Sequence, residues 1–180
     1  FQIRSNPLLD NAGNVIGSMS ADMFIDSTES EMDSMERVTI RLYFANEAGD
    51  GLVETNRTLE YSSFSTNISM ERLVVEQVIS GPSEQVKGKV FPTLNPDTKI
   101  VGVTVKDGTC YVNLNDNFLA QIYNVTSDVA IYSLVNSLVE LPNVNRVQIA
   151  VNGDSNVMFR ENTSLSVTYE RNLNIVTTVD

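Results

Sequence analysis

Residues 99–114 read KIVGVTVKDGTCYVNL, and this stretch decides the class of the fold. Alternate residues are apolar from Val101 to Val105 and again from Cys110 to Leu114, which is the pattern of strands with one buried face. Between them lies Asp107-Gly108, a pair that predicts a type I′ turn with positive φ at both positions. Two strands joined by so short a turn run antiparallel, so the sequence excludes a doubly wound parallel sheet.

The segments upstream of this hairpin also predict strands. Residues 38–44 alternate between apolar and other side chains, residues 46–51 have the composition of a turn, and residues 57–61 predict a second short strand. Closer to the first residue, residues 2–4 and 14–16 predict two short strands around an Asn-Ala-Gly turn.

A change to helical spacing follows. Residues 69–80 place Met, Leu and Val side chains on one face and charged side chains on the other. Ser69 is a suitable N-cap, and Gly81-Pro82 ends the segment. The sequence therefore predicts an amphipathic helix over residues 69–80.

A second helix is predicted over residues 127–141. Its apolar side chains again share a face, Thr126 or Ser127 can cap its first turn, and Pro142 ends it. Residues 147–151 then alternate as a strand before an Asn-Gly turn.

These elements follow the order β-(β)-α-β-β-α-β. They predict an α+β fold with a mixed, largely antiparallel sheet and two helices packed on one face. Extra strands are expected at both termini, including residues 157–159 and 166–176. We expect an acidic N-terminal segment or linker over residues 1–37, a domain over residues 38–153, and a C-terminal extension over residues 154–180 whose strands pack on the domain.

The composition excludes several classes of function. The chain has 12 basic and 23 acidic residues and a formal net charge of −11, which argues against binding to nucleic acid or directly to anionic lipid. It has no histidine, and Cys110 is its one cysteine, which excludes a Ser-His-Asp triad, a Cys-His dyad, an internal disulfide and a CxxC metal site. No apolar run is long enough to span a bilayer.

Taken in order, these segments resemble the GerMN domain, which is found in sporulation and spore-germination lipoproteins of Gram-positive bacteria. The segments that carry the resemblance are residues 38–44 with Leu52-Val53-Glu54, Ser80-Gly81-Pro82, Phe91-Pro92, residues 97–113, Tyr132, Val135-Asn136-Ser137-Leu138, Pro142, Val144, Val147-Gln148-Ile149 and Gly153. The resemblance covers residues 38–153, and Tyr169-Glu170-Arg171-Asn172 resembles what commonly follows this domain.

The resemblance implies a fold similar to the ring-building motifs of secretion and sporulation channels. It also implies an exported lipoprotein, held at the outer face of the cytoplasmic membrane by a lipidated cysteine upstream of Phe1. Its partners would be other envelope proteins or further copies of the chain, in a ring or another oligomer. Because the family has no established catalytic residues, we assign no catalytic, cofactor-binding or metal-binding residues and no cofactor.

Three features of the sequence are weighed as sites. The acidic residues from Asp22 to Glu36 offer oxygens to calcium, but they lack a glycine and EF-hand spacing, which favours a solvated linker. Residues 113–117 (NLNDN) are interpreted as a polar turn. Cys110 is in phase with Leu114, which predicts a buried small hydrophobic residue and not a nucleophile.

Enzymatic activity is not expected. A pair of carboxylates can hydrolyse glycosides without histidine, but tryptophan is absent and aromatic residues make up 7% of the chain, so nothing indicates a sugar cleft. Five tyrosines are equally consistent with a recognition surface and with ordinary core or edge positions: Tyr43, Tyr61, Tyr111, Tyr123 and Tyr132.

We therefore expect a non-catalytic extracytoplasmic module that binds other proteins, with sporulation or germination implied by the resemblance. The physical basis is a sheet edge available for pairing. The alternative is a module that binds or senses a cell-wall fragment or a small molecule. A closed apolar pocket with convergent polar groups would favour the ligand, whereas a flat apolar patch or a bare strand edge would favour a protein partner.

Overall fold

The computed structural model describes residues 7–10, 14–17, 37–60, 68–161 and 163–178. The chain divides into two compact units, one formed by residues 1–39 and 58–66 and the other by residues 40–57 and 67–180. Each unit is described by itself.

In the first unit, β1 (Pro7–Asp10) pairs antiparallel with β2 (Asn14–Gly17). The strand expected at residues 14–16 is therefore confirmed. The strand expected at residues 2–4 lies outside the described residues, as does the acidic run at residues 22–36.

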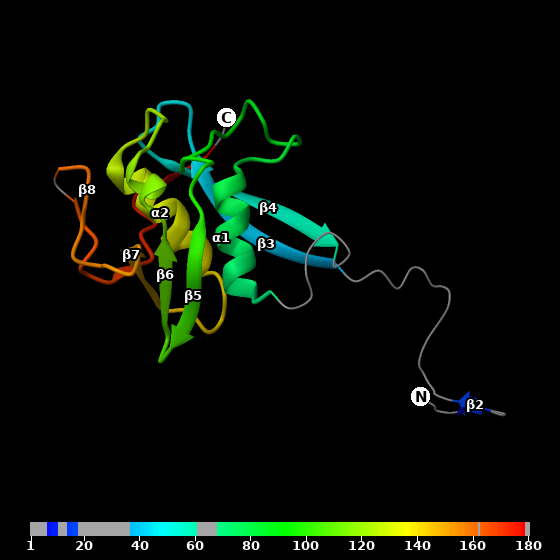
Figure 1. The fold of residues 1–180 in the computed structure, drawn as a ribbon. Coiled ribbons are helices and arrows are strands. Elements are labelled where there is room, and N and C mark those ends of the chain that lie inside the picture. Colours follow the sequence, from blue (N-terminus) through cyan, green and yellow to red (C-terminus); the bar gives the residue numbers. More distant parts are fainter. Residues whose placement is uncertain (1–6, 11–13, 18–36, 61–67, 162, 179–180) are drawn as a thin grey trace. The chain divides into compact units, whose positions relative to one another are not determined.

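The second unit contains a four-stranded sheet, of which β5, β6 and β7 are labelled in Figure 1. In space its strands follow the order β10 (Tyr169–Glu170), β7 (Arg146–Val151), β6 (Thr109–Leu114) and β5 (Ile100–Lys106). The β5–β6 and β7–β10 pairs are antiparallel, and the β6–β7 pair is parallel. This mixed sheet confirms the class of fold that the hairpin predicted.

The hairpin of β5 and β6 has the predicted turn. Its side chains do not follow the predicted alternation along the whole of β5. Asp107 and Gly108 have φ values of 54° and 80°, as a type I′ turn requires. Ile100 pairs with Leu114, but Gly102 pairs with Asn113, so Val101 is an extra residue in a β-bulge. The bulge leaves the Val101 side chain 56% exposed.

A three-stranded sheet contains the strands that precede α1. Its order is β11 (Val176–Thr177), β4 (Leu52–Glu60) and β3 (Arg37–Ala45). β4 is longer than the expected strand at residues 57–61, because it begins directly after the turn at residues 46–51. β11 lies parallel to β4 and pairs with Leu52 and Val53.

Both predicted helices form with their predicted N-caps. α1 (Met70–Ser80) is capped by the Ser69 hydroxyl, which accepts a hydrogen bond from the Arg72 N–H at 3.1 Å. α2 (Ser127–Leu138) is capped by Thr126. α2 ends three residues earlier than expected, because the Leu141 N–H turns to the Leu138 carbonyl and residues 139–141 tighten into a turn.

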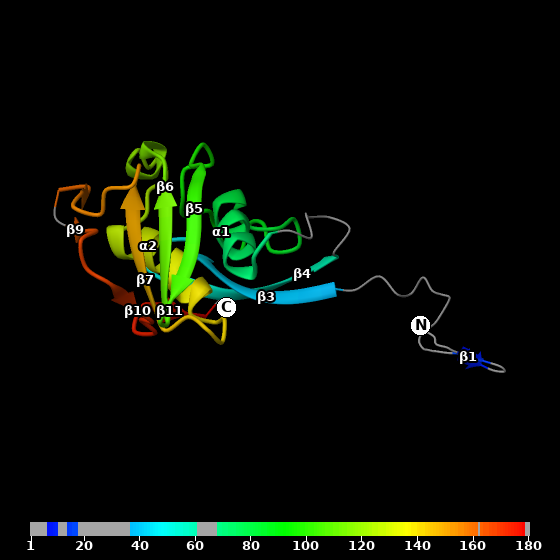
Figure 2. The same cartoon turned by 60° about the horizontal axis from the view of Figure 1, so that its bottom comes forward.

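The helices contact each other and both sheets. α1 packs against β5 and α2 against β7 and β10, and Figure 2 shows α2 passing behind the strands β5 to β7. On another side of α2, the Ser137 hydroxyl accepts a hydrogen bond from the Tyr43 N–H of β3 at 3.0 Å. The strands expected in one sheet therefore lie in two, and α2 is buried on nearly all sides over residues 129–139, with Tyr132 half-buried.

The C-terminal residues contribute short strands and core side chains. β8 (Met158–Phe159) pairs with β9 (Thr163–Ser164), and β10 and β11 join the two larger sheets. Phe159 is fully buried, and its ring centroid lies 5.1 Å from that of Phe118. Residues near the end of the chain thus help to close the core.

The buried hydroxyl of Thr98 predicts a stabilising substitution. Thr98 is 3% exposed, and its Oγ1 has no hydrogen-bond partner among the described residues. Because a buried hydroxyl without a partner destabilises the fold, Thr98→Val is expected to raise the free energy of unfolding in urea by about 1 kcal/mol.

Thr93→Val is the matched control for this prediction. Thr93 is also buried, but its Oγ1 donates a 2.8 Å hydrogen bond to the Ser133 hydroxyl, so its loss should lower the same free energy by about 1 kcal/mol. A Thr98→Val variant that is destabilised as much as Thr93→Val would contradict the prediction.

Candidate functional site

The tyrosines selected from the sequence do not gather on one surface. Tyr43 is 2% exposed and belongs to the core, whereas Tyr111 on β6 is 41% exposed. Tyr132 on α2 is half-buried and packs edge-to-face on Tyr169, with 5.6 Å between the ring centroids. Tyr123 is also half-buried, and Tyr61 lies outside the described residues. These positions are those of core and edge residues.

Two other candidates have structural roles, and that of Cys110 is the one the sequence predicted. Cys110 is fully buried on β6, and burial, with a smaller contribution from the Glu71 carboxylate, raises the pKa of its thiol to about 12. The thiol is therefore protonated at neutral pH. The polar turn expected at residues 113–117 is not formed: Asn113 and Leu114 end β6, and the Asn115 side chain accepts a hydrogen bond from the Asn117 N–H and caps the 3-10 helix Asp116–Leu119.

The raised pKa of Cys110 predicts a loss of stability at alkaline pH. The folded state keeps the thiol proton that the unfolded chain releases above a pKa of 9.0. Its contribution to stability is thus complete below pH 9 and falls as the pH rises towards 12, by about 1.4 kcal/mol per pH unit. Wild type should lose about 2 kcal/mol more than Cys110→Ala between pH 8 and about pH 10.5.

Urea unfolding of both proteins under reducing conditions checks this prediction. The cavity created by Cys110→Ala gives an offset that does not depend on pH, and the two proteins share their other titrating groups. A free-energy gap between them that stays constant over this pH range would show that the thiol does not titrate differently in the two states.

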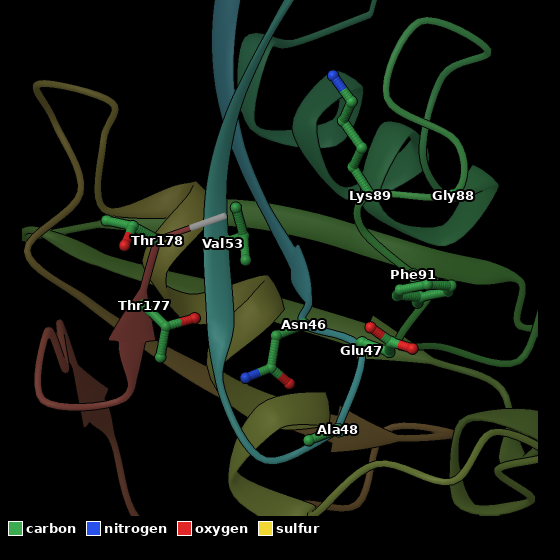
Figure 3. Close-up of a pocket in the computed structure, with 9 residues that line it drawn as sticks. All are labelled: Asn46, Glu47, Ala48, Val53, Gly88, Lys89, Phe91, Thr177 and Thr178. Atoms are coloured by element: carbon green, nitrogen blue, oxygen red, sulfur yellow. The ribbon is translucent and has the colours of Figure 1, made fainter. Parts of the chain in front are cut away.

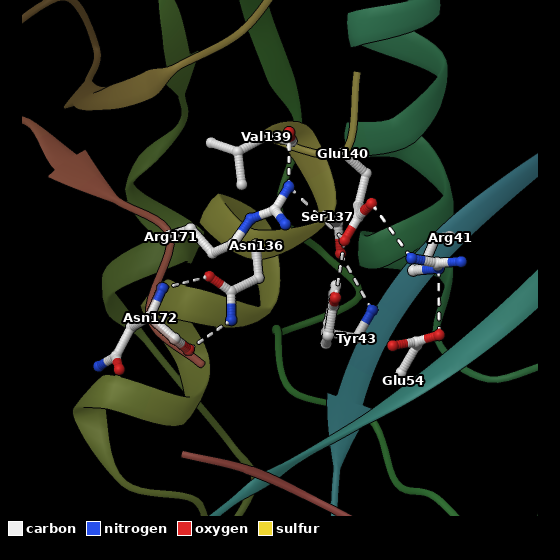
Figure 4. Close-up of polar contacts among 9 residues, drawn as sticks. All are labelled: Arg41, Tyr43, Glu54, Asn136, Ser137, Val139, Glu140, Arg171 and Asn172. Atoms are coloured by element: carbon white, nitrogen blue, oxygen red, sulfur yellow. Dashed lines mark hydrogen bonds and ion pairs between the residues drawn. The ribbon is translucent and has the colours of Figure 1, made fainter. Parts of the chain in front are cut away.

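A polar cluster around Glu140 joins α2 to β3 and to the segment after β10 (Figure 4). The Glu140 carboxylate accepts a 2.7 Å hydrogen bond from the Tyr43 hydroxyl and pairs with Arg41 at 3.4 Å and Arg171 at 3.7 Å. Its side chain is 17% exposed. Arg41 also pairs with Glu54 of β4 at 3.1 Å.

The cluster around Glu140 has the features of a structural contact and not of a catalytic site. Burial and the hydrogen bond to Glu140 raise the pKa of Tyr43, so the hydroxyl stays protonated and keeps donating to the carboxylate. The Glu140 carboxylate has a hydrogen-bond donor and two cations as partners, which leaves it unsuited to acid–base chemistry. Among the described residues, no group of three or more cysteine or carboxylate side chains is placed to hold a metal ion.

One site among the described residues that offers open space is a groove at β4, here called the Lys89 groove. It consists of two adjoining cavities of about 460 and 490 Å³ that share Val53, Lys89, Thr177 and Thr178. The first is also lined by Asn46, Glu47, Ala48, Gly88 and Phe91, and the second by Glu54, Thr55, Asn56, Val86, Val90 and Val176. Figure 3 shows Lys89 and Phe91 on one side of β4 and Thr177 and Thr178 on the other.

The groove combines apolar surface with one basic side chain, Lys89, and two acidic ones, Glu47 and Glu54. Val53 and Val90 are buried in its wall, and Val86 and Val176 are half-buried. Lys89 is exposed, and in the described part of the chain no carboxylate lies within ion-pair distance of it. The neighbouring Lys87, in contrast, pairs with Glu84 at 3.5 Å.

Reasoning from the sequence did not select the Lys89 groove. Its lining comes from the turn at residues 46–48, from β4, from residues 86–91 and from β11 with the residue that follows it. The apolar residues of these segments are ordinary core residues in the sequence, and Lys89 lies in a loop without a motif. No local pattern in the chain could have indicated the groove.

Comparison with known proteins identifies the family. The family model described as Germane, sporulation and spore germination, matches residues 41–157. This chain belongs to the Germane family. The match confirms the GerMN resemblance and links the chain to sporulation or spore germination. None of the curated proteins matches the sequence at a significant level.

Solved structures share the Germane fold. The tandem GerMN domains of the sporulation protein GerM from Bacillus subtilis match with a TM-score of 0.61 and 21% identity, over 82% of this chain and 50% of that chain. The present chain therefore spans about half the length of that tandem protein. The first GerMN domain of the same protein matches with a TM-score of 0.56 and 17% identity, over 76% of this chain and 98% of that one.

A third match is a putative lipoprotein from Clostridium perfringens, with a TM-score of 0.49 and 15% identity over 82% of this chain and 93% of that chain. In the Germane chain itself, no helix among the described residues is long and apolar enough to cross a bilayer.

Proposed function

We propose that this Germane-family chain is a non-catalytic extracytoplasmic module that binds other proteins of the cell envelope during sporulation or spore germination. Membership of the family supports the process. The partners are other envelope proteins or further copies of the chain, and attachment to the membrane is through a lipid anchor upstream of Phe1.

The observation that carries this proposal is the edge of β4. This strand runs from Leu52 to Glu60, and the described residues of β11 pair with Leu52 and Val53 of it. An unpaired strand edge presents main-chain donors and acceptors to other polypeptides, and many peptide-binding domains use such an edge. The Lys89 groove is lined by Val53, Glu54, Thr55 and Asn56 of this strand and adds apolar surface to it.

Chemical cross-linking in the native cells tests the proposal. Growing and sporulating cultures are cross-linked, the chain is isolated, and the linked peptides are identified by mass spectrometry. We expect links from defined positions of this chain to specific envelope proteins or to a second copy, and more of them in one culture than in the other. Absence of any linked protein from both cultures would contradict the proposed function.

The sizes of the two cavities favour one second candidate, a module that binds a small molecule or a cell-wall fragment. Volumes of about 460 and 490 Å³ lie in the range of small-ligand sites, about 300–1,000 Å³. Against it, charged and polar groups in the lining point in no common direction in Figure 3. Co-purification of a glycan or small molecule with the chain, in place of protein links, would select this candidate.

A further inference from the structure

Another cavity among the described residues lies between α1 and the residues that lead into β5. Its volume is about 400 Å³, within the range of small-ligand sites, about 300–1,000 Å³. α1 packs against β5, and Figure 1 shows the helix alongside that strand. The lining comes from α1 and from residues 96–100, so this cavity, here called the α1 cavity, is separate from the Lys89 groove.

Thr98 forms the base of the α1 cavity. It is the one buried residue of the lining, at 3% exposed, and its Oγ1 has no hydrogen-bond partner among the described residues. The fold thus keeps a buried hydroxyl that destabilises it. Oγ1 is itself covered, so other atoms of Thr98 face the cavity, and rotation about the Cα–Cβ bond exchanges the positions of hydroxyl and methyl group.

Two cations and one carboxylate line the α1 cavity. Arg72 pairs with Glu76 at 3.6 Å within the helix, so these two charges offset each other. Lys99 is exposed, and in the described part of the chain no carboxylate lies within ion-pair distance of it. The neighbouring Asp97 is exposed and is not part of the lining. The positive charge of Lys99 is therefore the one left for an anionic group of a ligand.

Two isoleucines supply apolar surface to the α1 cavity. Ile79 of α1 and Ile100 of β5 both line it, and both are half-buried, so each keeps apolar surface in contact with water. An aliphatic group that packs on them removes water from apolar surface on both sides, which favours binding. The lining therefore fits a ligand with an aliphatic body and an anionic group at one end.

We propose that the α1 cavity binds a small carboxylic acid with an aliphatic side chain. The carboxylate lies beside Lys99 and accepts a hydrogen bond from the rotated Thr98 hydroxyl, and the aliphatic group packs on Ile79 and Ile100. The hydroxyl thereby gains the partner that it lacks within the fold, and bound ligand stabilises the folded chain. Because this site is separate from the Lys89 groove, the ligand adds to the proposed function and does not replace it.

Titration of the full 180-residue chain with N-acetyl-leucine, followed by NMR of the backbone amides, tests this inference. The probe has a carboxylate and an aliphatic side chain, and we expect saturable shifts centred on Ile79, Thr98 and Lys99. N-acetyl-leucinamide lacks the carboxylate and should bind about tenfold more weakly. Acetate lacks the aliphatic group and should also bind about tenfold more weakly.

Two pairs of variants locate the bound probe. Lys99→Gln removes the charge and should weaken binding of N-acetyl-leucine about tenfold, whereas Lys106→Gln, at the other end of β5, should bind within about twofold of wild type. Thr98→Val removes the hydroxyl and should also weaken binding about tenfold, whereas Thr98→Ser keeps a hydroxyl and should bind within about threefold of wild type. Since Thr98→Val is expected to be more stable than wild type, misfolding does not explain a loss of binding.

Three results would overturn the inference: no saturable binding of N-acetyl-leucine to wild type, equal binding of the acid and its amide, or binding to Lys99→Gln or Thr98→Val as tight as to wild type. A Thr98→Val variant that is more stable and binds the probe unchanged would show that the Thr98 hydroxyl is a packing defect and not part of a site. Cross-linking in cells tests the protein partners separately, because the titration uses the isolated chain.

Discussion

Gly49→Ala is expected to lower the free energy of unfolding by about 3 kcal/mol or more, a large part of the stability of an ordinary domain. Gly49 has a φ of +77°, and a methyl group there would clash with the backbone carbonyl of Asn124. Positive φ alone costs an alanine about 1–2 kcal/mol. The clash adds to this, because backbone atoms cannot move aside as a flexible side chain can.

The surroundings of Gly49 make relief of this clash difficult. Its N–H donates to the Asn46 side-chain oxygen at 2.8 Å, and its carbonyl accepts a hydrogen bond from the Thr126 N–H at 2.9 Å. Thr126 is the N-cap of α2. A shift of Gly49 away from Asn124 would thus disturb both the β3–β4 turn and the start of the buried helix.

Gly153→Ala separates the cost of a positive φ from the cost of the clash with the Asn124 carbonyl. Gly153 has a similar φ of +84°, but a methyl group there would meet nothing within 4 Å. Its substitution should cost about 1 kcal/mol, from the backbone conformation alone. Urea unfolding of the two variants beside wild type makes the comparison, and equal losses of stability in both would contradict the role given to the Asn124 carbonyl.

Asn136→Ala is expected to destabilise the fold by about 3 kcal/mol. The Asn136 side chain is fully buried on α2, donates to the Asn172 carbonyl at 2.9 Å and accepts from the Asn172 N–H at 2.9 Å. The substitution removes both hydrogen bonds and leaves two half-buried main-chain groups of Asn172 without these partners. Each loss of this kind costs about 1–2 kcal/mol.

This prediction also has a local readout. Exchange of the Asn172 amide should accelerate in Asn136→Ala, because its acceptor is gone. Asn174→Ala is the matched control: its side chain is exposed, so its stability should stay within about 0.5 kcal/mol of wild type. Unchanged exchange at Asn172, or equal effects of both variants, would argue against this contact as the anchor of the C-terminal residues.

Local signals in the sequence predicted most of the elements. The Asp107-Gly108 turn, the Ser69 and Thr126 caps and the alternation of residues 38–44 each act within a few residues of the chain, and each is found in the structure. The division into two sheets had no such signal. It depends on which distant strands pair: β4 pairs with β3 and with the two-residue β11, more than a hundred residues downstream, and not with β5, β6 or β7.

One clue to that division was present in the sequence of α2. Besides its apolar face, the helix carries Ala130, Ser133 and Ser137, small residues that let a neighbouring backbone approach. Ser137 does contact the backbone of β3. A helix with apolar or small residues all round is a helix covered on more than one side, which is what the structure shows.

The Lys89 groove could not be predicted from the sequence, for a related reason. Lys89 and the valines of the groove come together only when the loop after α1, β4 and β11 are all in place. Glu140 is a comparable case, because its partners Arg41 and Arg171 lie far from it in the sequence and on either side of it. Contacts of this kind depend on tertiary packing and not on local periodicity.

The bulge at Val101 helps the chain to avoid aggregation through the edge of its four-stranded sheet. β5 is the last strand of its sheet, and a straight, flat last strand would recruit identical strands from neighbouring molecules. The extra residue at Val101 breaks the regular spacing of donors and acceptors there. This irregular border therefore disfavours pairing of β5 with a second copy of the chain.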